Sequence, residues 1–376
     1  MDFEPSDDQR LLLESVSRLL ADTYSFAQRK TYIAAPEGWS KAIWAQFAEL
    51  GLLGLPFPEA YGGFGGGAQE IMLVMQQFGR VLVVEPFLST VVFGGTAIMT
   101  AGTAAQKDAL LPAIAEGRLK LAFAHGERQA RYDLTDVITT AKKDGDGWIL
   151  DGSKTVVAHG DSADTLIVSA RTSGDRYDED GITLFLVDAT SQGVAHRGYV
   201  TRDETRAADI SLSNVRATAV LGEVGKGLAT IQRVIEAGIA ATAAETVGAM
   251  EAMNDMTLEY SKTRVQFGQP IGTYQVVQHR MSDMFMTQEQ GRSMAMLATM
   301  SLDNADPVER AHDLAMAKVG VAQAGRYVSQ SAVQMHGGIG MTEEYAVGHY
   351  FRRCMVLERL FGDPAYYLQR LANEVG

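Results

Sequence analysis

Apolar positions in the first third of the chain repeat at helical spacing. The leucine-rich stretch 11–20 places apolar residues every three or four positions, and Ser6-Asp7-Asp8-Gln9 ahead of it has the form of a capping box. A helix is therefore predicted to begin near Asp7. Similar apolar stripes predict helices over 39–53, 69–84 and 104–116, with prolines and a glycine-rich run at 62–67 separating them.

The pattern then changes to short β-rich runs. They cover 119–124, 137–142, 148–154, 165–170, 183–187 and 208–212. Asp144-Gly145-Asp146-Gly147 lies between two of these runs and predicts a hairpin, because such residues tolerate positive φ. Strands at this spacing predict a β-sandwich or barrel that ends near Val220.

Long helical patterns return beyond Gly225, over 228–264, 274–303, 307–336 and 343–360. Patterns of this length predict a helical bundle, in which the many methionines fill the core. The sequence thus predicts an α+β protein with an N-terminal helical domain over 1–117, a middle β-sandwich or barrel domain over 118–220 and a C-terminal four-helix bundle over 221–376. A chain of 376 residues is long enough for several such cores.

The composition narrows the range of functions. Hydrophobic residues make up 46% and charged residues 21% of the chain, which is typical of a globular protein. The 46 acidic residues outnumber the 33 basic ones and give a formal net charge of −13, so no nucleic acid or anionic membrane surface is expected as a partner. The longest apolar stretch, 81–102, is interrupted by Glu85 and Pro86, and we interpret it as buried helix and loop, without membrane insertion.

The cysteine content and the first residues bear on the compartment. Cys354 is the single cysteine of the chain, which excludes an intrachain disulfide and a cysteine-based metal site, and we expect no metal. The sequence begins Met1-Asp2-Phe3-Glu4-Pro5, without the basic region and apolar stretch of a signal peptide. A reducing, cytoplasmic location is therefore expected.

Two segments of the C-terminal part carry residues suited to a phosphate-bearing ligand. In the segment 334–341, Gln-Met-His-Gly-Gly-Ile-Gly-Met, three glycines within four residues allow close backbone approach to a ligand. In the segment 260–272, Arg264 and Phe267 follow a long predicted helix, and a guanidinium suits bidentate phosphate binding. Taken singly, each segment is more simply a turn that ends a helix.

Together these segments resemble motifs of the acyl-CoA dehydrogenase family, and the resemblance extends over nearly the whole chain. The family's Arg-x-x-Phe-Gly segment and the glutamine downstream are matched by Arg264, Phe267 and Gln275. Its Gln-x-x-Gly-Gly-x-Gly segment and the continuation of that motif are matched by Gln334, Gly337, Gly338, Gly340, Glu344 and Arg352. In the middle part, Asp151-Gly152-Ser153-Lys154 is similar to the family's Asn-Gly-x-Lys strand motif.

The resemblance implies an oligomeric flavoprotein that binds FAD. In such a protein Arg264, Phe267, Gln275, Gln334, Gly337 and Gly338 would reach a cofactor held mainly by a neighbouring subunit. The implied chemistry is removal of the α proton of an acyl-CoA thioester by a carboxylate, with hydride transfer from the β carbon to the flavin. An electron-transferring flavoprotein is the implied electron acceptor.

The positions of the family's catalytic carboxylate depart from this pattern. When Arg352 and Gly362 are aligned with the family's C-terminal motif, Phe361 occupies the place of the usual glutamate, and phenylalanine cannot accept a proton. The alternative place for the base, on the first long helix of the last domain, falls on Gly238. Ile239 follows where most members have an arginine.

Two carboxylates lie near these positions, Asp363 and Glu236. Asp363 belongs to a Gly-Asp-Pro turn, where an Asx turn or a helix N-cap is the stronger interpretation. Glu236 is two residues from Gly238, and two residues rotate a helical side chain by roughly 200°, so it would face away. Asp363 and Glu236 stay the candidate bases, and neither fits the family's register.

The segments that face the flavin in the family are also altered. Val156 and Ala158 stand where a tryptophan and a threonine are usual, and the sequence after Phe123 lacks the family's Thr-Glu-Pro motif. His125 is a candidate to face the flavin, and a structural histidine is at least as good an interpretation. Phe123, His125, Val156 and Ala158 are the candidate cofactor-binding residues of this part.

Such departures are similar to those in paired-subunit members of the family, in which one of two related chains has lost catalytic residues. The segment 154–164 resembles small subunits of pimeloyl-CoA dehydrogenase type. This predicts a subunit of an FAD-dependent acyl-CoA dehydrogenase, in a homo-oligomer or in a heterotetramer with a sister chain, with a non-standard or partner-supplied base. A non-catalytic scaffolding or acyl-CoA-binding partner and an acyl-CoA oxidase are the alternatives.

Overall fold

A computed structural model describes residues 5–375 as two compact units. The first unit combines the described residues up to Thr31 with Ala68–Val83 and the chain from Ile239 onward. The second combines Tyr32–Gly67 with Val84–Gly238. Each unit thus draws on segments far apart in the sequence, and the domain boundaries near 117 and 220 stay predictions.

The first unit contains two helices from the N-terminal part, α1 (Asp7–Thr23) and α4 (Ala68–Val81). The Ser6 side chain accepts a hydrogen bond from Gln9 N, and the Gln9 side chain accepts one from Ser6 N. This reciprocal capping box starts α1 at the predicted residue. The predicted helix start near Asp7 is confirmed.

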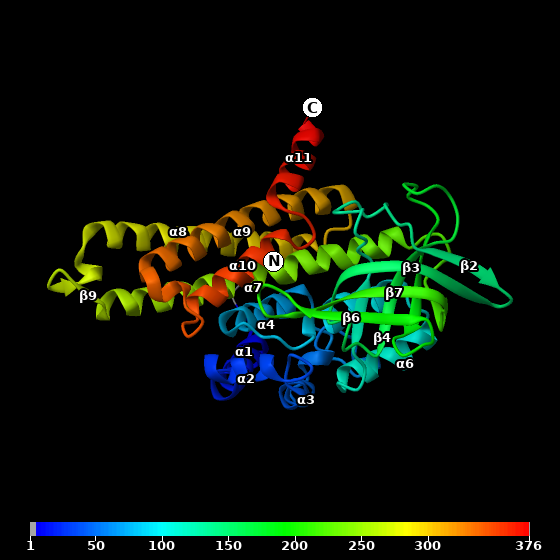
Figure 1. The fold of residues 1–376 in the computed structure, drawn as a ribbon, viewed down its shortest axis with the longest axis horizontal. Helices are drawn as coiled ribbons and strands as arrows, with labels where there is room; N and C mark the ends of the chain where they lie inside the picture. Colours follow the sequence, from blue (N-terminus) through cyan, green and yellow to red (C-terminus); the bar gives the residue numbers. More distant parts are fainter. Residues whose placement is uncertain (1–4, 376) are drawn as a thin grey trace. The chain divides into compact units, whose positions relative to one another are not determined.

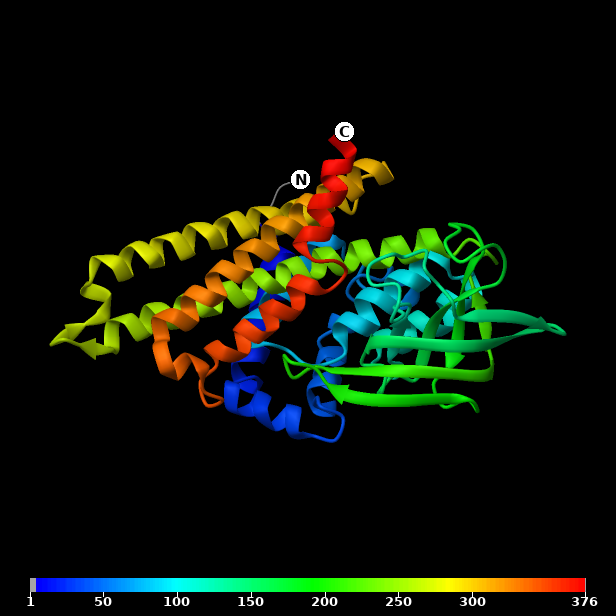
Figure 2. The same cartoon turned by 45° about the horizontal axis from the view of Figure 1, so that its top comes forward.

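The C-terminal helices supply the rest of the first unit. They are α7 (Leu228–Thr263, from Ile239 on in this unit), α8 (Gln275–Ser301), α9 (Pro307–His336), α10 (Val347–Arg359) and α11 (Pro364–Val375). The side chain of Asp306 caps α9 by accepting from Val308 N, and Pro307 takes the first position, where its missing N–H costs nothing. Figure 2 shows α8 and α9 side by side along their lengths, as a helical bundle requires.

Two glycines let the backbones of α4 and α7 touch. A Cβ added at Gly248 would lie 1.9 Å from Gln76 O, and one at Gly79 would lie 2.0 Å from Glu245 O. Any side chain at either position would therefore force the two helices apart. This contact joins an N-terminal segment to the C-terminal bundle, and the separate helix patterns gave no sign of it.

The second unit is built around a sheet with the strand order β6-β7-β3-β2-β4-β5-β8, in which β1 pairs with β4 (Figure 1). The strands are β1 (Leu121–Ala124), β2 (Thr140–Asp144), β3 (Gly147–Ala158), β4 (Thr165–Arg171), β5 (Ile182–Asp188), β6 (Val194–Val200), β7 (Arg206–Arg216) and β8 (Ala219–Leu221). The predicted hairpin joins β2 to β3, and its Gly145 has a φ of 58°. The sequence pattern does not predict β6, because most of its residues are exposed.

Helical segments accompany the sheet in the second unit. They are α3 (Lys41–Glu49), the 3-10 turns η1 (Leu52–Gly54) and η2 (Glu59–Tyr61), the π-helix η3 (Leu88–Gly94), α5 (Gly95–Ala101) and α6 (Ala104–Ala115), while α2 (Phe26–Ala34) runs across the boundary of the units. The residues of η3 are nearly all buried, so the interpretation of 81–102 as buried helix is confirmed. Among the described residues, no helix has the length and apolar character to cross a membrane.

Candidate functional site

A short hairpin after α7 presents Phe267 to solvent. Strands β9 (Val265–Gln266) and β10 (Gln269–Pro270) pair, and the two residues between them, Phe267 and Gly268, have φ values of 53° and 83°. Two left-handed residues in a two-residue loop match the twist of a hairpin, but a bulky aromatic residue there is unusual. The Phe267 ring is 95% exposed, so the loop holds it out where another molecule can cover it.

Arg264 and Gln334 are exposed polar side chains of the first unit. Neither side chain has a hydrogen bond or an ion pair with any residue of the described range 5–375. Gln275, the first residue of α8, is exposed as well. These groups are therefore available to a ligand or to a neighbouring chain.

The glycines after α9 leave open space beside them. The turn η5 (Gly337–Met341) follows α9, and Gly337 has a φ of 63°. A Cβ added at Gly337 or at Gly338 would meet no atom within 4 Å. The conformation requires glycine at Gly337, and the open space fits close approach of a phosphate-bearing group to the backbone.

A cluster of three aromatic rings brings the two motif segments together. The His336 ring lies 4.5 Å from the Tyr260 ring, nearly parallel to it, and 5.0 Å from the Tyr345 ring. Burial lowers the pKa of His336, so the ring packs as a neutral imidazole. The end of α7, which leads to Arg264, is thus fixed beside the end of α9, which leads to the glycine turn. We name the exposed group Arg264, Phe267, Gln334, Gly337 and Gly338 the phosphate arm.

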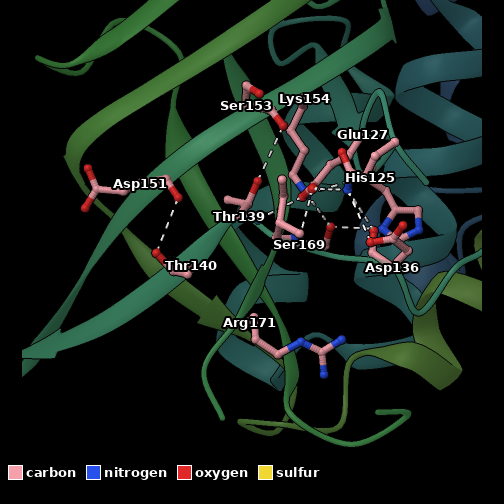
Figure 3. Close-up of polar contacts among 12 residues, drawn as sticks. His125, Glu127, Asp136, Thr139, Thr140, Asp151, Ser153, Lys154, Ser169 and Arg171 are labelled. Carbon is pink, nitrogen blue, oxygen red and sulfur yellow. Dashed lines mark hydrogen bonds and ion pairs between the residues drawn. The ribbon is translucent and has the colours of Figure 1, made fainter. Parts of the chain in front are cut away.

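In the second unit a buried lysine connects the segments after β1 and within β3 (Figure 3). Lys154 Nζ donates to Glu127 Oε1 at 2.7 Å, to Ser169 Oγ at 2.9 Å and to His125 O at 3.2 Å. The lysine side chain is 0% exposed and the glutamate side chain 2%. The structure thus places Lys154, the last residue of the Asn-Gly-x-Lys-like strand motif, at the centre of a buried network.

The pKa values of this network follow from burial and from the ion pair. Burial lowers the pKa of Lys154 to about 8 against the opposing charge of Glu127. Burial also acts to raise the pKa of Glu127, but the charge of Lys154 and the hydrogen bonds it receives bring that pKa down to about 2. Both groups are therefore charged near neutral pH, and together they form one compensated pair.

His125 belongs to the same network. Its Nδ1 lies 2.9 Å from Ser169 Oγ, and Figure 3 shows the ring beside Glu127 and Lys154. Burial, followed by the charge of Lys154, lowers the pKa of His125 to about 3, which keeps the imidazole neutral. The ring of Phe123, which is half-buried, lies 6.1 Å from the His125 ring. We call His125, Glu127, Lys154 and Ser169 the buried network.

A bulge in β3 exposes Val156. The register between β3 and β7 shifts between Lys154 and Val157, and Val156 has a φ of 54°. Its side chain is 63% exposed, and its N–H donates to Asp209 Oδ1 at 3.3 Å. Val156 and the half-buried Ala158 have no polar side-chain atom. A flavin lying on this strand would therefore meet backbone groups and apolar side chains there.

The residues at the expected base positions have defined local roles. Phe361 follows α10 with a φ of 66°, and its carbonyl accepts from Tyr367 Oη at 2.8 Å. Asp363 caps α11 by accepting from Tyr366 N at 2.9 Å, as an N-cap does. Glu236 is 8% exposed and accepts from Arg233 Nη1 at 2.9 Å. Both candidate carboxylates already hold another group.

Sequence reasoning missed Lys318, which anchors the end of α10. Its buried Nζ donates to Leu357 O at 2.7 Å, and burial lowers its pKa to about 7. A cation bonded to a carbonyl of the last helical turn satisfies a group that the helix itself leaves unpaired. The signal was a lysine on the apolar stripe of α9, a position where a solvated side chain does not fit.

The chain matches three family models in order along its length. The N-terminal domain of acyl-CoA dehydrogenase matches residues 6–118, the middle domain matches 122–215 and the C-terminal domain matches 225–375. The chain belongs to the acyl-CoA dehydrogenase family. Members of this family are FAD-binding flavoprotein oxidoreductases, and the fold predicted from the resemblance is confirmed.

Relatives and solved structures agree with this membership. Acyl-CoA dehydrogenase fadE12 of Mycobacterium tuberculosis is 31% identical over 315 residues, which cover 81% of this chain and 80% of that protein. The structure of butyryl-CoA dehydrogenase from Megasphaera elsdenii is similar with a TM-score of 0.92, 27% identity and full coverage of both chains (100% each). The ChsE4-ChsE5 complex from Mycobacterium tuberculosis contains a chain similar with a TM-score of 0.88, 25% identity and coverage of 100% of this chain and 99% of that one.

Proposed function

We propose that this chain is a subunit of an FAD-dependent acyl-CoA dehydrogenase that introduces an α,β double bond into an acyl-CoA thioester, and that the catalytic base comes from a sister chain. The observation that carries the proposal is the state of the two nearby carboxylates. Asp363 is used as a helix cap and Glu236 as an ion-pair partner, while Phe361 stands at the family's base position. Asp363 and Glu236 therefore each already hold another group, and Phe361 has no carboxylate.

The phosphate arm supports binding of FAD. Arg264 offers two parallel N–H donors to a diphosphate, and the NH₂ group of the Gln334 amide offers further N–H donors. The open backbone at Gly337 and Gly338 lets such a group approach closely. These residues fit the phosphate part of the cofactor, and their exposure suits a cofactor bound mainly by a neighbouring subunit.

The second unit would meet the flavin ring through Val156 and Ala158. With FAD bound, the flavin supplies the hydride acceptor for the β carbon of the substrate. The side chains of this chain supply shape there and no proton donor, because both are apolar. His125 and Lys154 would have a structural role: they would hold β3 against the segment that follows β1, and they would not exchange protons with the substrate.

The assembly proposed is a heterotetramer with a sister acyl-CoA dehydrogenase chain, similar to small subunits of pimeloyl-CoA dehydrogenase type. The similarity to a chain of the two-component ChsE4-ChsE5 complex supports such pairing. An electron-transferring flavoprotein is the proposed electron acceptor, and the cytoplasm is the proposed location. The proposed substrate of the assembly is an acyl-CoA whose acyl group is long, branched, dicarboxylic or ring-bearing.

The deciding experiment compares the chain alone with the chain co-expressed with a sister subunit. FAD content per chain and turnover of straight-chain acyl-CoA with an artificial acceptor are measured for both. The isolated chain is expected to turn over about 10²–10⁴-fold more slowly, which is the usual contribution of a general base. Brisk turnover by the isolated chain would contradict the partner-supplied base.

A non-catalytic scaffolding role is the second candidate. It is favoured by the apolar side chains at Val156 and Ala158, which leave a flavin fewer hydrogen-bonding partners on this strand. In that case substitution of Arg264 would change neither FAD content nor turnover of the co-expressed complex. Measuring FAD content and turnover of the co-expressed complex, with and without the Arg264 substitution, therefore distinguishes the two candidate functions.

A further inference from the structure

A short segment joins α10 to α11, and one of its residues has an unusual backbone conformation. α10 ends at Arg359 and α11 begins at Pro364, so only residues 360–363 turn the chain from one helix into the other (Figure 1). Phe361 has a φ of 66°, in the left-handed region that a bulky side chain rarely adopts. Gly362 follows with a φ of 128°, so the glycine of this segment does not relieve the conformation of Phe361.

Two hydrogen bonds hold this segment in place. Lys318 Nζ donates to Leu357 O, in the last turn of α10, at 2.7 Å. Tyr367 Oη donates to Phe361 O at 2.8 Å, which fixes the carbonyl of the left-handed residue itself. The Tyr367 ring also leaves no room beside Gly362, where an added Cβ would lie 2.5 Å from a ring carbon. The backbone of the segment is therefore fixed by α9 through Lys318 and by α11 through Tyr367.

The buried cation of Lys318 also interacts with charges at both ends of the segment. Burial lowers the pKa of Lys318, and the negative charges of Glu358 and Asp363 act in the opposite direction. Glu358 belongs to the last turn of α10 and pairs with Arg326, while Asp363 caps α11. A single ammonium group of α9 thus interacts with both helices that the segment joins.

The left-handed conformation is a sign that the side chain of Phe361 is held in a set direction. Non-glycine residues in this region are strained, persist only where the surrounding structure fixes them, and gather at functional sites. Val156 and Phe267 have the same conformation, and the family resemblance places both against the cofactor. Phe361 stands at the position of the family's catalytic carboxylate. The strain thus coincides with the position from which a base would reach the substrate.

We infer that residues 361–363 are a presenting turn that holds residue 361 toward the reacting carbons of the substrate, and that Lys318 and Tyr367 are its positioning residues. This role rests on the proposed function, since it takes the family's base position as the place of proton removal. The turn lacks only the carboxylate. With a carboxylate at position 361, the α proton would pass to its oxygen and the β hydrogen would leave as a hydride to bound flavin. The electron pair of the α C–H bond would then form the α,β double bond.

The first test gives the turn its missing group. Phe361→Glu is compared with Phe361→Gln in the isolated full-length chain, with FAD added in excess, because the two side chains have nearly the same shape and only glutamate can accept the proton. Turnover of octanoyl-CoA with an artificial electron acceptor should be about 10²–10⁴-fold faster in Phe361→Glu, which is the usual contribution of a general base. Leu360→Glu, which places the carboxylate one residue outside the turn, should be as slow as Phe361→Gln.

The second test addresses the positioning residues in the Phe361→Glu background. Tyr367→Phe removes the hydrogen bond to the carbonyl of residue 361, so kcat should fall about tenfold while KM for octanoyl-CoA stays within about twofold, since orientation is lost and binding is kept. Lys318→Met should lower kcat in the same way. Tyr366→Phe, which leaves the bond from Tyr367 in place, is the matched control. A residue that only stabilised the fold would lower the urea midpoint without lowering kcat.

The third test examines the backbone conformation without cofactor or substrate. A left-handed residue favours glycine over alanine, so Phe361→Gly should unfold at a higher urea concentration than Phe361→Ala. At Leu360, which is extended, glycine should be no more stable than alanine.

Equal turnover of Phe361→Glu and Phe361→Gln, with FAD bound in both, would overturn the inference. So would an unchanged kcat after Tyr367→Phe, or a Phe361→Gly variant no more stable than Phe361→Ala. The comparison of glycine with alanine decides if Phe361→Glu does not fold. Failure of the proposed function has a different result, namely brisk turnover by the unmodified chain.

Discussion

The phosphate arm and the buried network both contain polar and charged side chains, but those of the arm are exposed and those of the network are buried. The side chains of Arg264 and Gln334 are exposed and have no bonding partner within residues 5–375, whereas the Lys154 side chain is fully buried and bonded to three groups. In the network Glu127 of the same chain compensates the charge of Lys154, so the contacts described there support the fold. In the arm the partner must come from outside. A polar side chain that stabilises the fold has its bonding partners within the chain, whereas a polar side chain that binds a ligand or a neighbouring chain finds its partner there.

The first way to break this comparison is to remove the lysine of the buried network. Lys154→Ala leaves the buried carboxylate of Glu127 without its cation, and it should cost about 3–5 kcal/mol of unfolding free energy, or prevent folding. Urea denaturation measures this change. Lys120→Ala is the matched control, because Lys120 forms a partly exposed pair with Asp164 and should cost at most about 1 kcal/mol. Equal costs for both variants would show that burial is not what makes Lys154 important.

The second prediction addresses the phosphate arm. Arg264→Ala should leave the fold intact and weaken FAD affinity by about 1.5–3 kcal/mol, through loss of a charge-assisted contact to a diphosphate. Flavin titration of the apoprotein, in the assembled oligomer, gives the affinity. Arg18→Ala, at an exposed arginine of α1, is the control and should change neither quantity. If FAD affinity is the same in all three proteins, Arg264 is a surface residue only.

Sequence reasoning was most successful where periodicity sets structure. The predicted helix over 307–336 has the same bounds as α9, because Asp306 and Pro307 fix its start and a glycine with positive φ ends it. The strand β6 was missed, since an edge strand exposed on both faces has no alternation of apolar residues. The family motifs name the residues of the phosphate arm, and the structure shows Arg264, Phe267 and Gln334 exposed. Their role toward a cofactor stays a prediction.

The buried network could not be predicted in the same way. Lys154 matches a family motif, but nothing in a single sequence says that it is buried or that Glu127 is its partner 27 residues away. That pairing depends on β1 and β3 meeting in the fold. The close contact of α4 with α7 at Gly79 and Gly248 could not be predicted for the same reason. In a single sequence, a glycine within a helix pattern indicates only a low helix propensity.

The third prediction uses pH to sharpen the distinction. The native pKa of His125 is about 3, whereas an unfolded histidine titrates near 6.5, so the unfolded chain binds an extra proton between these values. Stability should therefore fall as the pH falls, by about 2 kcal/mol between pH 7 and pH 5. Glu127, with a native pKa of about 2, extends the loss of stability below pH 4.5.

The test compares unfolding free energies across this range. His125→Gln should flatten the dependence between pH 7 and pH 5, because glutamine takes up no proton. His279→Gln, at an exposed histidine of α8, should leave the slope as it is in the unmodified chain. An unchanged slope in His125→Gln would mean that the histidine is not held neutral by the buried network.

The smallest effect on stability is expected from substitution of Asp363. This residue caps α11 and is also a candidate for the catalytic base. As the cap of α11 it accepts from Tyr366 N, so Asp363→Ala should cost about 1 kcal/mol, while Asp363→Asn, which can still cap, should cost only a few tenths. Neither change should alter turnover if a sister chain supplies the base. If Asp363→Asn instead abolishes turnover of the isolated chain with FAD content and stability retained, Asp363 is itself the base. A capping residue would then also be a catalytic one, and the partner-supplied base would be wrong.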